Sequence, residues 1–391
     1  MFDARDHDGG QVARLYPGCS HPYASRVRIT DVTTLLLRVP LKQRTITDSQ
    51  SRVDAVEFLQ VVLATDDGIT GYGMNWSYTP GLRAAQVLVD DTYVPVLRGA
   101  DATLRKELVR RMYYANHFVG RVGAAAVGLA AVEFALWDLA CKRAGLPLWR
   151  LLGPCRERVP AYSTDGGWLS FGVDDLVRDM SALVARGFDA VKMKLGLPDP
   201  AEDLRRVAAV RRALGPEIRL MTDVNTQWTL ATAIPFGARL AEHDMFWLEE
   251  PLHPFDVKAH ARLARAIATP LACGETIYTK YAFRDFLEAG ALGFAQPDAT
   301  KLLGIDEWLE VAALCAAANV PVVPHTNVQQ KLHVQLAAAT PGALLVESCY
   351  ESIADIWEDP VRVVDGHYTL PEEPGVGLRL RDAVVREHRI G

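Results

Sequence analysis

Residues 219–252 read RLMTDVNTQWTLATAIPFGARLAEHDMFWLEEPL and contain the repeating unit that decides the fold. A short apolar run ends at Asp223, an amphipathic segment with helical spacing follows, and a second apolar run ends at Glu249. A strand, a helix and a second strand in this order are typical of a βαβ unit, in which the two strands are parallel.

The same alternation covers the chain from Val159 onward. Helical segments such as DDLVRDMSALVARG and IDEWLEVAALCAAAN separate short apolar runs. Eight such runs with helices between them predict a (β/α)8 barrel over residues 156–364, which closes its own sheet edges. The runs are VPAYST, AVKMKLG, RLMTDVN, FWLEEPL, PLACGE, GFAQPD, VPVVPH and LLVES.

The residues before the barrel are organised differently. A strand-like run at Ile29–Leu41 and a predicted hairpin with the turn Asp66-Asp67-Gly68 come first. Helical segments follow, and the last of them ends at Gly145. Strands followed by a block of helices predict an α+β domain over residues 26–155.

Both ends of the chain lie outside these patterns. Residues 1–25 form a polar arm without an apolar core segment, so no signal peptide is expected. Residues 365–391 contain no further βα unit, and we expect them to return to the first domain.

The composition is that of an ordinary globular protein. Of 391 residues, 49% are hydrophobic and 23% are charged, which excludes a disordered, collagen-like or coiled-coil chain. The net charge of −6 comes without a run of like charges, so neither nucleic acid nor a membrane surface is an expected partner. No apolar stretch reaches about 18 uninterrupted residues, so no membrane span is expected. Six scattered cysteines are typical of reduced thiols in a cytoplasmic protein.

Seven of the barrel runs end in an ionisable residue. The intervals between these residues are 29, 26, 26, 23, 27 and 22, about one βα unit each. All seven therefore fall at the carboxyl ends of strands, where barrel enzymes place their catalytic groups. A single such residue is usually just the first solvated residue of a loop, but seven in phase are hard to explain by packing. They are Lys194, Asp223, Glu249, Glu275, Asp298, His325 and Glu347.

Three of these residues, Asp223, Glu249 and Glu275, come from consecutive strands. Three converging carboxylates cannot all stay ionised without a cation, because like charges raise one another's pKa. Oxygen ligands without thiol or imidazole suit Mg²⁺ better than zinc, so we expect one Mg²⁺ per site. The alternatives are a proton-sharing cluster or a solvated acidic rim. Glu250 is expected to point away, in a supporting or structural position.

Two lysines stand two residues apart on one strand, so Lys192 and Lys194 face the same side of the sheet. Two inward ammonium groups are expected to lower each other's pKa, which suits one of them to act as a base. Alternatively one of them, most simply Lys192, pairs with the acidic cluster. Asn225 follows Asp223 by two residues and can donate to a substrate oxygen.

Asp298 and His325 come from neighbouring strands, and a carboxylate beside an imidazole fixes its tautomer and raises its basicity. Lys301 is expected to help neutralise Asp298. Glu347 can donate a hydrogen bond to a developing oxyanion if it stays protonated. His333, like the other histidines outside the phase, is expected to be an ordinary core residue.

A base on one side, a dyad on the other and Mg²⁺ between them indicate one class of reaction. Lys194 or His325 removes the proton α to a carboxylate, and the metal and its neighbours stabilise the enediolate. Reprotonation of the other face gives racemisation or epimerisation. Loss of a β-leaving group gives dehydration or cycloisomerisation.

The ordered motifs resemble those of the mandelate racemase subgroup of the enolase superfamily, over nearly all of the chain after Arg26. They are KMK at 192–194, DVN at 223–225, EEP at 249–251, GET at 274–276, QPDATK at 296–301 and PHT at 324–326. Residues 130–153 resemble the capping-domain helix of that family, and PGVGL at 374–378 resembles its C-terminal return. Two positions depart from the pattern: Glu133 replaces the usual Asp, and Thr276 replaces the Asn of mandelate racemase, which disfavours mandelate as substrate.

The resemblance implies a capping domain over a modified barrel, Mg²⁺ on Asp223, Glu249 and Glu275, and opposed bases Lys194 and His325. It also implies that two capping-domain loops, around 44–52 and 75–81, choose the substrate. The residues expected to contact the substrate are Trp76, His117 and Arg121, in addition to Asn225 and Lys301.

Members with both the lysine and the dyad resemble acid-sugar dehydratases, which makes a lyase forming a 2-keto-3-deoxy acid from an aldonate or aldarate the leading hypothesis. The runner-up is an isomerase, either a cycloisomerase of 3,6-anhydro sugar acids or a racemase or epimerase of 2-hydroxy acids. A silent sugar-acid-binding barrel is the alternative without catalysis. Barrels of this size commonly assemble, so a homo-oligomer is expected.

Overall fold

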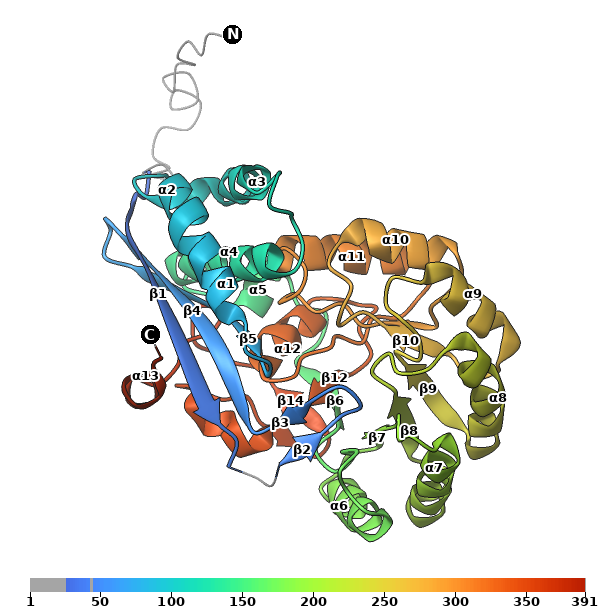
Figure 1. Cartoon of the computed structure of the whole chain (residues 1–391). Coiled ribbons are helices and arrows are strands. Elements are labelled where there is room, and N and C mark those ends of the chain that lie inside the picture. Colours follow the sequence, from blue (N-terminus) through green and yellow to red (C-terminus); the bar gives the residue numbers. More distant parts are fainter. Residues whose placement is uncertain (1–25, 43–44, 391) are drawn as a thin grey trace.

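The computed structural model describes residues 26–42 and 45–390, so the predicted arm at 1–25 lies outside the described residues. Figure 1 shows two parts, a sheet with its helices at one side and a ring of strands and helices at the other. They correspond to the α+β domain, here called the capping domain, and to the barrel.

The capping domain is built on three antiparallel strands, β1 (Ile29–Pro40), β4 (Ala55–Thr65) and β5 (Thr70–Ser77), in the order β1-β4-β5. The predicted DG turn joins β4 to β5, and Gly68 supplies the positive φ of 82°. The sheet is covered on both faces, because β4 is buried along nearly its whole length. A small hairpin, β2 (Ile46–Thr47) and β3 (Arg52–Val53), lies between β1 and β4 in the chain.

Helices cover one face of this sheet. The longest, α4, is apolar and long enough by composition to cross a membrane, although it is not an uninterrupted apolar run. Of the 18-residue window with this composition, 89% is buried inside the protein. It ends where predicted, with Gly145 in the left-handed region at φ 66°. The helical elements are α1 (Leu82–Leu88), η2 (Val89–Tyr93), α2 (Val94–Leu97), η3 (Ala102–Leu104), α3 (Arg105–Ala115), α4 (Ala124–Ala144) and α5 (Leu148–Leu152).

The predicted barrel is present, with parallel strands that follow one another in chain order around the ring. One predicted strand, the run at 320–325, makes only single bridges at Val322 to its two neighbours. Pro321 and Pro324 lie on either side of Val322 and Val323 in this run, and they lack the N–H groups that a longer ladder needs. The strands are β6 (Arg158–Ser163), β7 (Ala190–Lys194), β8 (Arg219–Asp223), β9 (Met245–Glu249), β10 (Leu271–Cys273), β11 (Phe294–Ala295) and β12 (Val346–Ser348).

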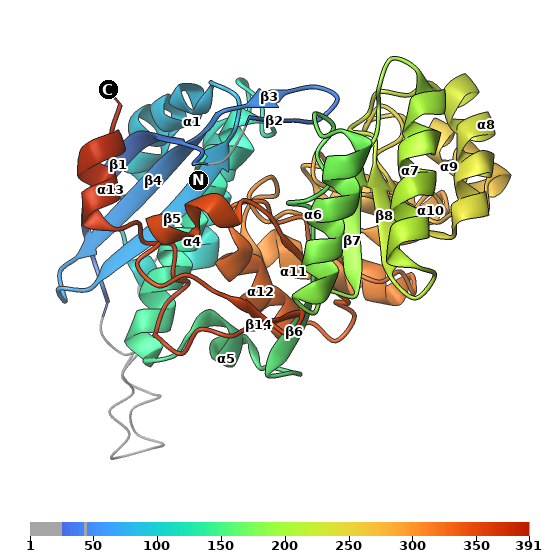
Figure 2. The ribbon, with the colours of Figure 1, turned by 90° about the horizontal axis from the view of Figure 1, so that it is seen from below.

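Amphipathic helices surround the strands, as both ribbon views show (Figures 1 and 2). Each of them buries its apolar side against the strand ring. They are α6 (Val173–Ala185), α7 (Pro200–Leu214), α8 (Leu230–Leu240), α9 (Val257–Ala266), α10 (Lys280–Glu288), α11 (Ile305–Ala317) and α12 (Gln330–Ala338), with the short turns η4 (Ala241–His243) and η5 (Glu351–Ile356).

The inside of the barrel is closed by an apolar layer to which each predicted strand run contributes one side chain. All of these side chains are buried and form one cluster, separate from the packing under the helices. The layer seals one end of the barrel, so water and substrate reach the interior only from the carboxyl ends of the strands. Its members are Tyr162, Ala190, Met221, Trp247, Ala272, Phe294, Val323 and Leu345.

The two parts are joined by a buried contact between α4 and α11. The carboxylate of Glu133 accepts hydrogen bonds from the backbone N–H groups of Ile305 and Asp306, at the first turn of α11. Anions at a helix N-terminus meet unpaired N–H groups and the positive end of the helix dipole. An added Cβ at Gly304 would lie 2.3 Å from Glu133 Oε2, which explains the glycine there.

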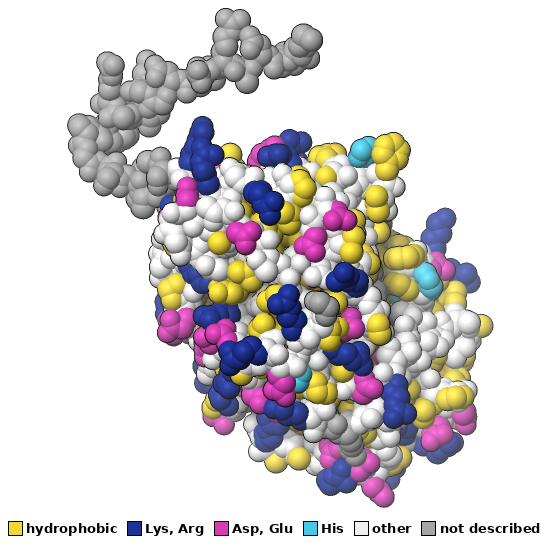
Figure 3. All heavy atoms as spheres, turned by 60° about the vertical axis from the view of Figure 1, so that its left-hand side comes forward, with side chains coloured by type: hydrophobic (Ala, Val, Ile, Leu, Met, Phe, Trp, Pro, Cys, Tyr) yellow, Lys and Arg dark blue, Asp and Glu magenta, His cyan; other side chains and the backbone are white. Residues whose placement is uncertain are grey.

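The C-terminal residues run back to the capping domain. β13 (Val363–Val364) and β14 (His367–Thr369) form a hairpin whose second strand pairs with β6. α13 (Asp382–His388) then packs along β1, where Ile390 N donates to Leu36 O at 2.8 Å. On the face shown in Figure 3, basic and acidic side chains are interspersed over the described surface.

Replacing Gly73 by alanine should lower the free energy of unfolding by about 2 kcal/mol or more. The added Cβ would lie 1.9 Å from the carbonyl oxygen of Ala131, because β5 packs directly on the backbone of α4. Gly342 is the matched control, since it has no atom within 4 Å of an added Cβ and no positive φ. Gly342→Ala should change stability by no more than about 0.5 kcal/mol. Urea unfolding followed by circular dichroism measures both, and a Gly73→Ala protein as stable as the parent would contradict the close packing.

Candidate active site

Polar side chains begin one step above the apolar layer. Residues two apart on a strand point to the same side, so the residue that follows each layer residue by two also faces the barrel interior. Seven of these positions are polar and buried. The pairs of layer residue and polar residue are Tyr162–Thr164, Ala190–Lys192, Met221–Asp223, Trp247–Glu249, Phe294–Gln296, Val323–His325 and Leu345–Glu347.

The three predicted metal ligands meet in this polar layer. Asp223, Glu249 and Glu275 each place a carboxylate oxygen so that all three lie within 4.8 Å of one another. Asp223 and Glu249 are direct neighbours in the register of β8 and β9. Burial, with the charges of Asp223 and Glu275, raises the pKa of Glu249 to about 7 even though Lys192 opposes the shift.

This donor set fits a divalent cation. It consists of hard oxygen atoms from three different strand ends, without sulfur or imidazole in the cluster, which suits Mg²⁺. Glu249 is held in place by Trp247 Nε1 at 2.9 Å and Gln296 Nε2 at 2.8 Å, both of which donate to its Oε2. Supporting hydrogen bonds of this kind orient a ligand before the metal arrives.

Both lysines point into the acidic cluster. Lys192 Nζ lies 2.6 Å from Glu249 Oε1 and 3.1 Å from Glu347 Oε1, and Lys194 Nζ donates to Asp223 Oδ2. Lys192 lowers the pKa of Lys194, as expected, but this repulsion does not decide the net direction. Burial does favour the neutral amine, but the pKa of Lys194 is raised because the charge of Asp223 outweighs burial and the repulsion from Lys192.

His325 and Asp298 form the predicted dyad. His325 Nδ1 lies 2.9 Å from Asp298 Oδ2, and His325 Nε2 lies 3.2 Å from Glu275 Oε2, on the cluster side. Burial opposes protonation, but the charge of Glu275 and the hydrogen bond to Asp298 raise the pKa of His325 to about 9. Although Asp298 is buried, the hydrogen bond with His325 helps to hold its pKa well below the usual range, so the ionised carboxylate accepts a hydrogen bond from His325 Nδ1–H.

The direct partners of Asp298 are histidines, and Lys301 acts on it through its charge from beyond ion-pair distance. The described residues within ion-pair distance of Asp298 are the histidines His325 and His333, the second at 3.3 Å, and not Lys301. His333 was expected to be an ordinary core residue, and it is fully buried, but it accepts from Ala299 N at 3.1 Å beside the dyad. Lys301 instead holds its Nζ 4.7 Å from the ring centroid of Trp76.

Glu347 is an ionised acceptor and not the protonated donor that we considered. Its Oε1 accepts from Thr164 Oγ1 at 2.6 Å. Burial raises the pKa of Glu347, but the charges of Lys192 and His325 outweigh burial and bring it below the usual range. Glu250 is buried as a supporting residue and accepts from Thr276 Oγ1 at 2.6 Å, so Thr276 has a structural partner at the position where it departs from mandelate racemase.

The predicted substrate contacts fall into two groups. Trp76 is buried with its ring 6.3 Å from that of His325, and the buried Asn225 has an Oδ1 atom without a hydrogen-bond partner. His117 and Arg121 are not brought to the cavity, because they lie in the turn between α3 and α4. His117 is exposed against Phe118, and Arg121 stacks on Tyr113.

A small cavity lies beside the acidic cluster, between the barrel and the capping domain. Two neutral residues of the cavity, Thr164 and Asn327, were not predicted, because only ionisable residues at strand ends were considered. Thr164 directly follows β6, and Asn327 follows His325 by two positions. Trp168 and Tyr350 stand in loops that gave no signal. The lining residues are Asp48, Tyr78, Thr164, Trp168, Lys194, Glu275, His325, Asn327, Glu347, Cys349 and Tyr350.

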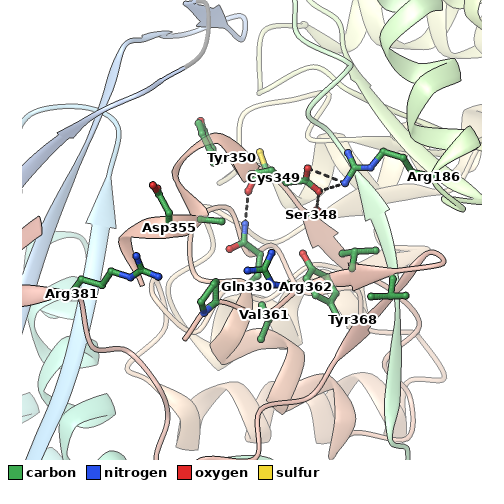
Figure 4. A pocket seen from close by; sticks show the side chains of 15 residues that line it. Arg186, Gln330, Ser348, Cys349, Tyr350, Asp355, Val361, Arg362, Tyr368 and Arg381 are labelled. Atoms are coloured by element: carbon green, nitrogen blue, oxygen red, sulfur yellow. Dashed lines mark hydrogen bonds and ion pairs between the residues drawn. The ribbon is translucent and has the colours of Figure 1, made fainter. Parts of the chain in front are cut away.

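A second, larger cavity lies on the other side of the residues that follow β12 (Figure 4). Arg186 and Arg381 stand on its wall, and the Gln330 side chain points to the carbonyl oxygen of Cys349. Cys349 and Tyr350 line both cavities and form the partition between them. The acidic cluster does not line this second cavity, so the chemistry belongs to the smaller one. All five described cysteines are free thiols.

The arrangement places one nitrogen group on each side of the three acids. Around the barrel Lys194 precedes Asp223, Glu249 and Glu275, and His325 follows them. A substrate carboxylate held at the cluster would have its α-carbon between an amine and an imidazole. That geometry suits abstraction of an α-proton and stabilisation of the resulting negative charge.

Comparison with known proteins agrees with this geometry. The family model for the mandelate racemase / muconate lactonizing enzyme N-terminal domain matches residues 29–153, and the enolase C-terminal domain-like model matches residues 175–384. The chain is 35% identical over 352 residues to the 3,6-anhydro-alpha-L-galactonate cycloisomerase of Streptomyces coelicolor, covering 90% of this chain and 97% of that one.

A second relative is the L-talarate/galactarate dehydratase of Salmonella typhimurium, 32% identical over 347 residues, which cover 88% of this chain and 85% of the relative. The structure of that dehydratase with magnesium and L-lyxarohydroxamate has a TM-score of 0.88 at 31% identity and covers 94% of each chain. The capping domain, the barrel, the ordered motifs and these matches together show that the chain belongs to the mandelate racemase/muconate lactonizing enzyme subgroup of the enolase superfamily.

Proposed function

We propose that the protein is a Mg²⁺-dependent dehydratase of sugar acids that converts its substrate to a 2-keto-3-deoxy acid. The observation that carries the proposal is the position of Lys194 and of the His325–Asp298 dyad on opposite sides of the three clustered acids. With opposed bases, one group can remove a proton from one face of a carbon while the other group delivers a proton to a neighbouring atom.

The substrate carboxylate is bound at the cluster of Asp223, Glu249 and Glu275. Mg²⁺, when bound, supplies positive charge that neutralises these acids and stabilises the charge that accumulates on the substrate carboxylate. Neutralising Asp223 and Glu275 also removes the partners that keep protons on Lys194 and His325. Lys192, fully buried, stays near Glu249 and Glu347 as a fixed positive charge.

The first step is removal of the C2 proton by Lys194 or by His325 Nε2, which leaves an enediolate. Asp298 holds the Nδ1–H tautomer of His325, so that Nε2 presents its lone pair to the substrate when the ring is neutral. In the second step the C3–O bond breaks, and the base on the other side gives its proton to the departing hydroxyl, which leaves as water. The enol product then becomes the 2-keto-3-deoxy acid.

Cycloisomerisation of a 3,6-anhydro sugar acid is the second candidate, supported by the 35% identity to the Streptomyces coelicolor cycloisomerase. Its first step is the same. The C3–O bond that breaks belongs to the ring ether, so the leaving oxygen stays in the product and no water is lost. A racemase or epimerase would stop at the enediolate and return a proton to the other face of C2.

A panel of sugar acids in D₂O with Mg²⁺ tests the proposal. We expect at least one acid to lose its C2 proton and to form a 2-keto acid that carries deuterium at C3, detected by NMR and by semicarbazone absorbance. A product lighter by one water indicates dehydration, whereas a product of unchanged mass indicates cycloisomerisation. Exchange without a 2-keto product would favour a racemase. If acids bind but none exchanges its C2 proton or forms a 2-keto acid, the protein is a silent binding barrel and the proposal is refuted.

Substituting either base should abolish turnover without unfolding the protein. We expect Lys194→Ala and His325→Asn each to lower kcat by about 10²–10⁴-fold, the range that acid–base groups contribute. Lys258→Ala, on the exposed side of α9, is the control and should retain the parent rate. Steady-state kinetics measures the rates, and circular dichroism checks the fold. Full activity in either variant would remove that residue from the mechanism.

Removing the metal should abolish turnover, and Mg²⁺ should restore it. Since Mg²⁺ binds the folded state, it should also raise the unfolding free energy, by about 2.7 kcal/mol at one hundred times its dissociation constant. Asp223→Asn should lose most of this stabilisation, because it removes a charged ligand from the cluster. Thermal unfolding with and without Mg²⁺ measures the effect, and equal stabilisation of the parent and Asp223→Asn would contradict the ligand assignment.

A further inference from the structure

The hairpin β2–β3 carries a short turn to the mouth of the barrel (Figure 2). Ser49 Oγ donates to the carbonyl oxygen of Val224 at 2.7 Å, and Gln50 Nε2 donates to the carbonyl oxygen of Asn225 at 2.5 Å. Leu169 N donates to Thr47 O at 2.9 Å, so a barrel loop also holds the hairpin. These contacts fix the turn against the strand end that carries Asp223.

Asp48 lies in this turn and is 7% exposed, on the wall of the active-site cavity. Its Oδ1 accepts from the backbone N–H groups of Gln50 at 2.7 Å and Ser51 at 2.6 Å. Within residues 26–42 and 45–390 its Oδ2 has neither a hydrogen-bond partner nor an ion-pair partner. The turn therefore presents one oriented carboxylate oxygen to the cavity.

The positive groups near Asp48 already face other acids. Of the described residues that line the cavity, Lys194 and His325 are the basic ones, and Lys194 lies against Asp223 while His325 lies against Glu275. Lys301 rests over the Trp76 ring and does not line the cavity. Burial and the charges of Glu275 and Asp48 raise the pKa of Tyr78 well above its usual value, as expected in a negative field.

We propose that Asp48 accepts a hydrogen bond from a hydroxyl group at the distal end of the substrate, and that the site therefore takes monocarboxylate sugar acids and rejects dicarboxylates. This inference rests on the proposed function, because it concerns the other end of the same substrate. The reacting groups come from the barrel, whereas Asp48 and Tyr78 come from the capping domain, so a substrate spans the space between them.

The chemistry of the two acid classes separates them at this end. An aldonate ends in a CH₂OH group, whose hydroxyl can donate to Asp48 Oδ2. The aldarate of the same configuration ends in a carboxylate, which offers no donor and places a second negative charge beside Asp48. In a cavity that excludes water, unpaired like charges at contact distance are strongly unfavourable. Anhydro aldonates carry one carboxylate and fall within the accepted class.

The test uses the full-length protein with Mg²⁺ and matched pairs of hexonates and hexarates of all configurations. We expect kcat/KM of the best aldonate to exceed that of every aldarate by at least about a hundredfold. An aldarate within about tenfold of the best aldonate would overturn the inference and leave the proposed function standing. Calorimetric binding to the same Mg²⁺-loaded protein decides the inference even when no acid turns over. Tighter binding of aldonates supports it, whereas equal binding, tighter binding of aldarates or no binding of either class overturns it.

Asp48→Asn isolates the charge, because an asparagine Oδ1 can still accept from Gln50 and Ser51 and keep the turn. We expect this variant to lose about tenfold in kcat/KM for the aldonate and to bind the matched aldarate about tenfold more tightly. Asp31→Asn, an exposed position on β1, is the control and should change neither value. An Asp48→Asn protein that keeps the selectivity of the parent would overturn the role of Asp48.

Discussion

The chemistry of this site depends on three buried carboxylates that lie too close together to keep their charges unaided. Asp223, Glu249 and Glu275 bring oxygen atoms within 4.8 Å of one another, and the pKa of Glu249 rises to about 7 as a result of burial and of its acidic neighbours. Lys192 and Lys194 lie on one side of this cluster, and the imidazole of His325 lies on the other. A protein with a net charge of −6 thus gathers positive charge at the site where the proposed substrate is an anion.

The barrel keeps this cluster rigid by alternating two kinds of layer. The lower layer takes one apolar side chain from each strand run, and the upper layer takes the residue two positions further on. Trp247 serves both layers, since its ring fills the lower one while its Nε1 donates to Glu249. Because packing determines the lower layer, the upper side chains have little freedom to move, and the charged groups are oriented before a substrate enters. Stability and chemistry therefore come from neighbouring positions on the same strands.

The regular spacing of ionisable residues at strand ends predicted the barrel. It also predicted that the acids, Lys192, Lys194 and the dyad lie together, because the alternation of side chains with a period of two is a local property of a strand. Charge states were harder to predict. The state of Lys194 depends on its distance from Asp223, and that of Glu347 on Lys192 and His325, which are contacts between strands that no spacing in the chain reveals. The positions of loop residues were difficult to predict for a related reason. His117 and Arg121 have suitable chemistry, but the turn that carries them packs against α3, whereas Trp168 enters the cavity from a loop without any periodic pattern.

The capping hairpin shows how a shared reaction can be given a particular substrate. The turn that carries Asp48 is anchored to the carbonyl oxygens of Val224 and Asn225, and Asn225 N in turn donates to Asp223 Oδ1 at 2.9 Å. The positive φ of Asn225, 46°, is part of the bend that turns this backbone toward the hairpin. The anchors on the barrel side are backbone atoms, whereas the turn itself is held by Asp48 Oδ1. A side chain at position 48 that still accepts from Gln50 N and Ser51 N can therefore replace aspartate without loosening either the turn or the metal ligand. In the proposed function the barrel fixes which bond is broken, and the capping domain fixes which charge and which hydroxyl the substrate carries at its far end.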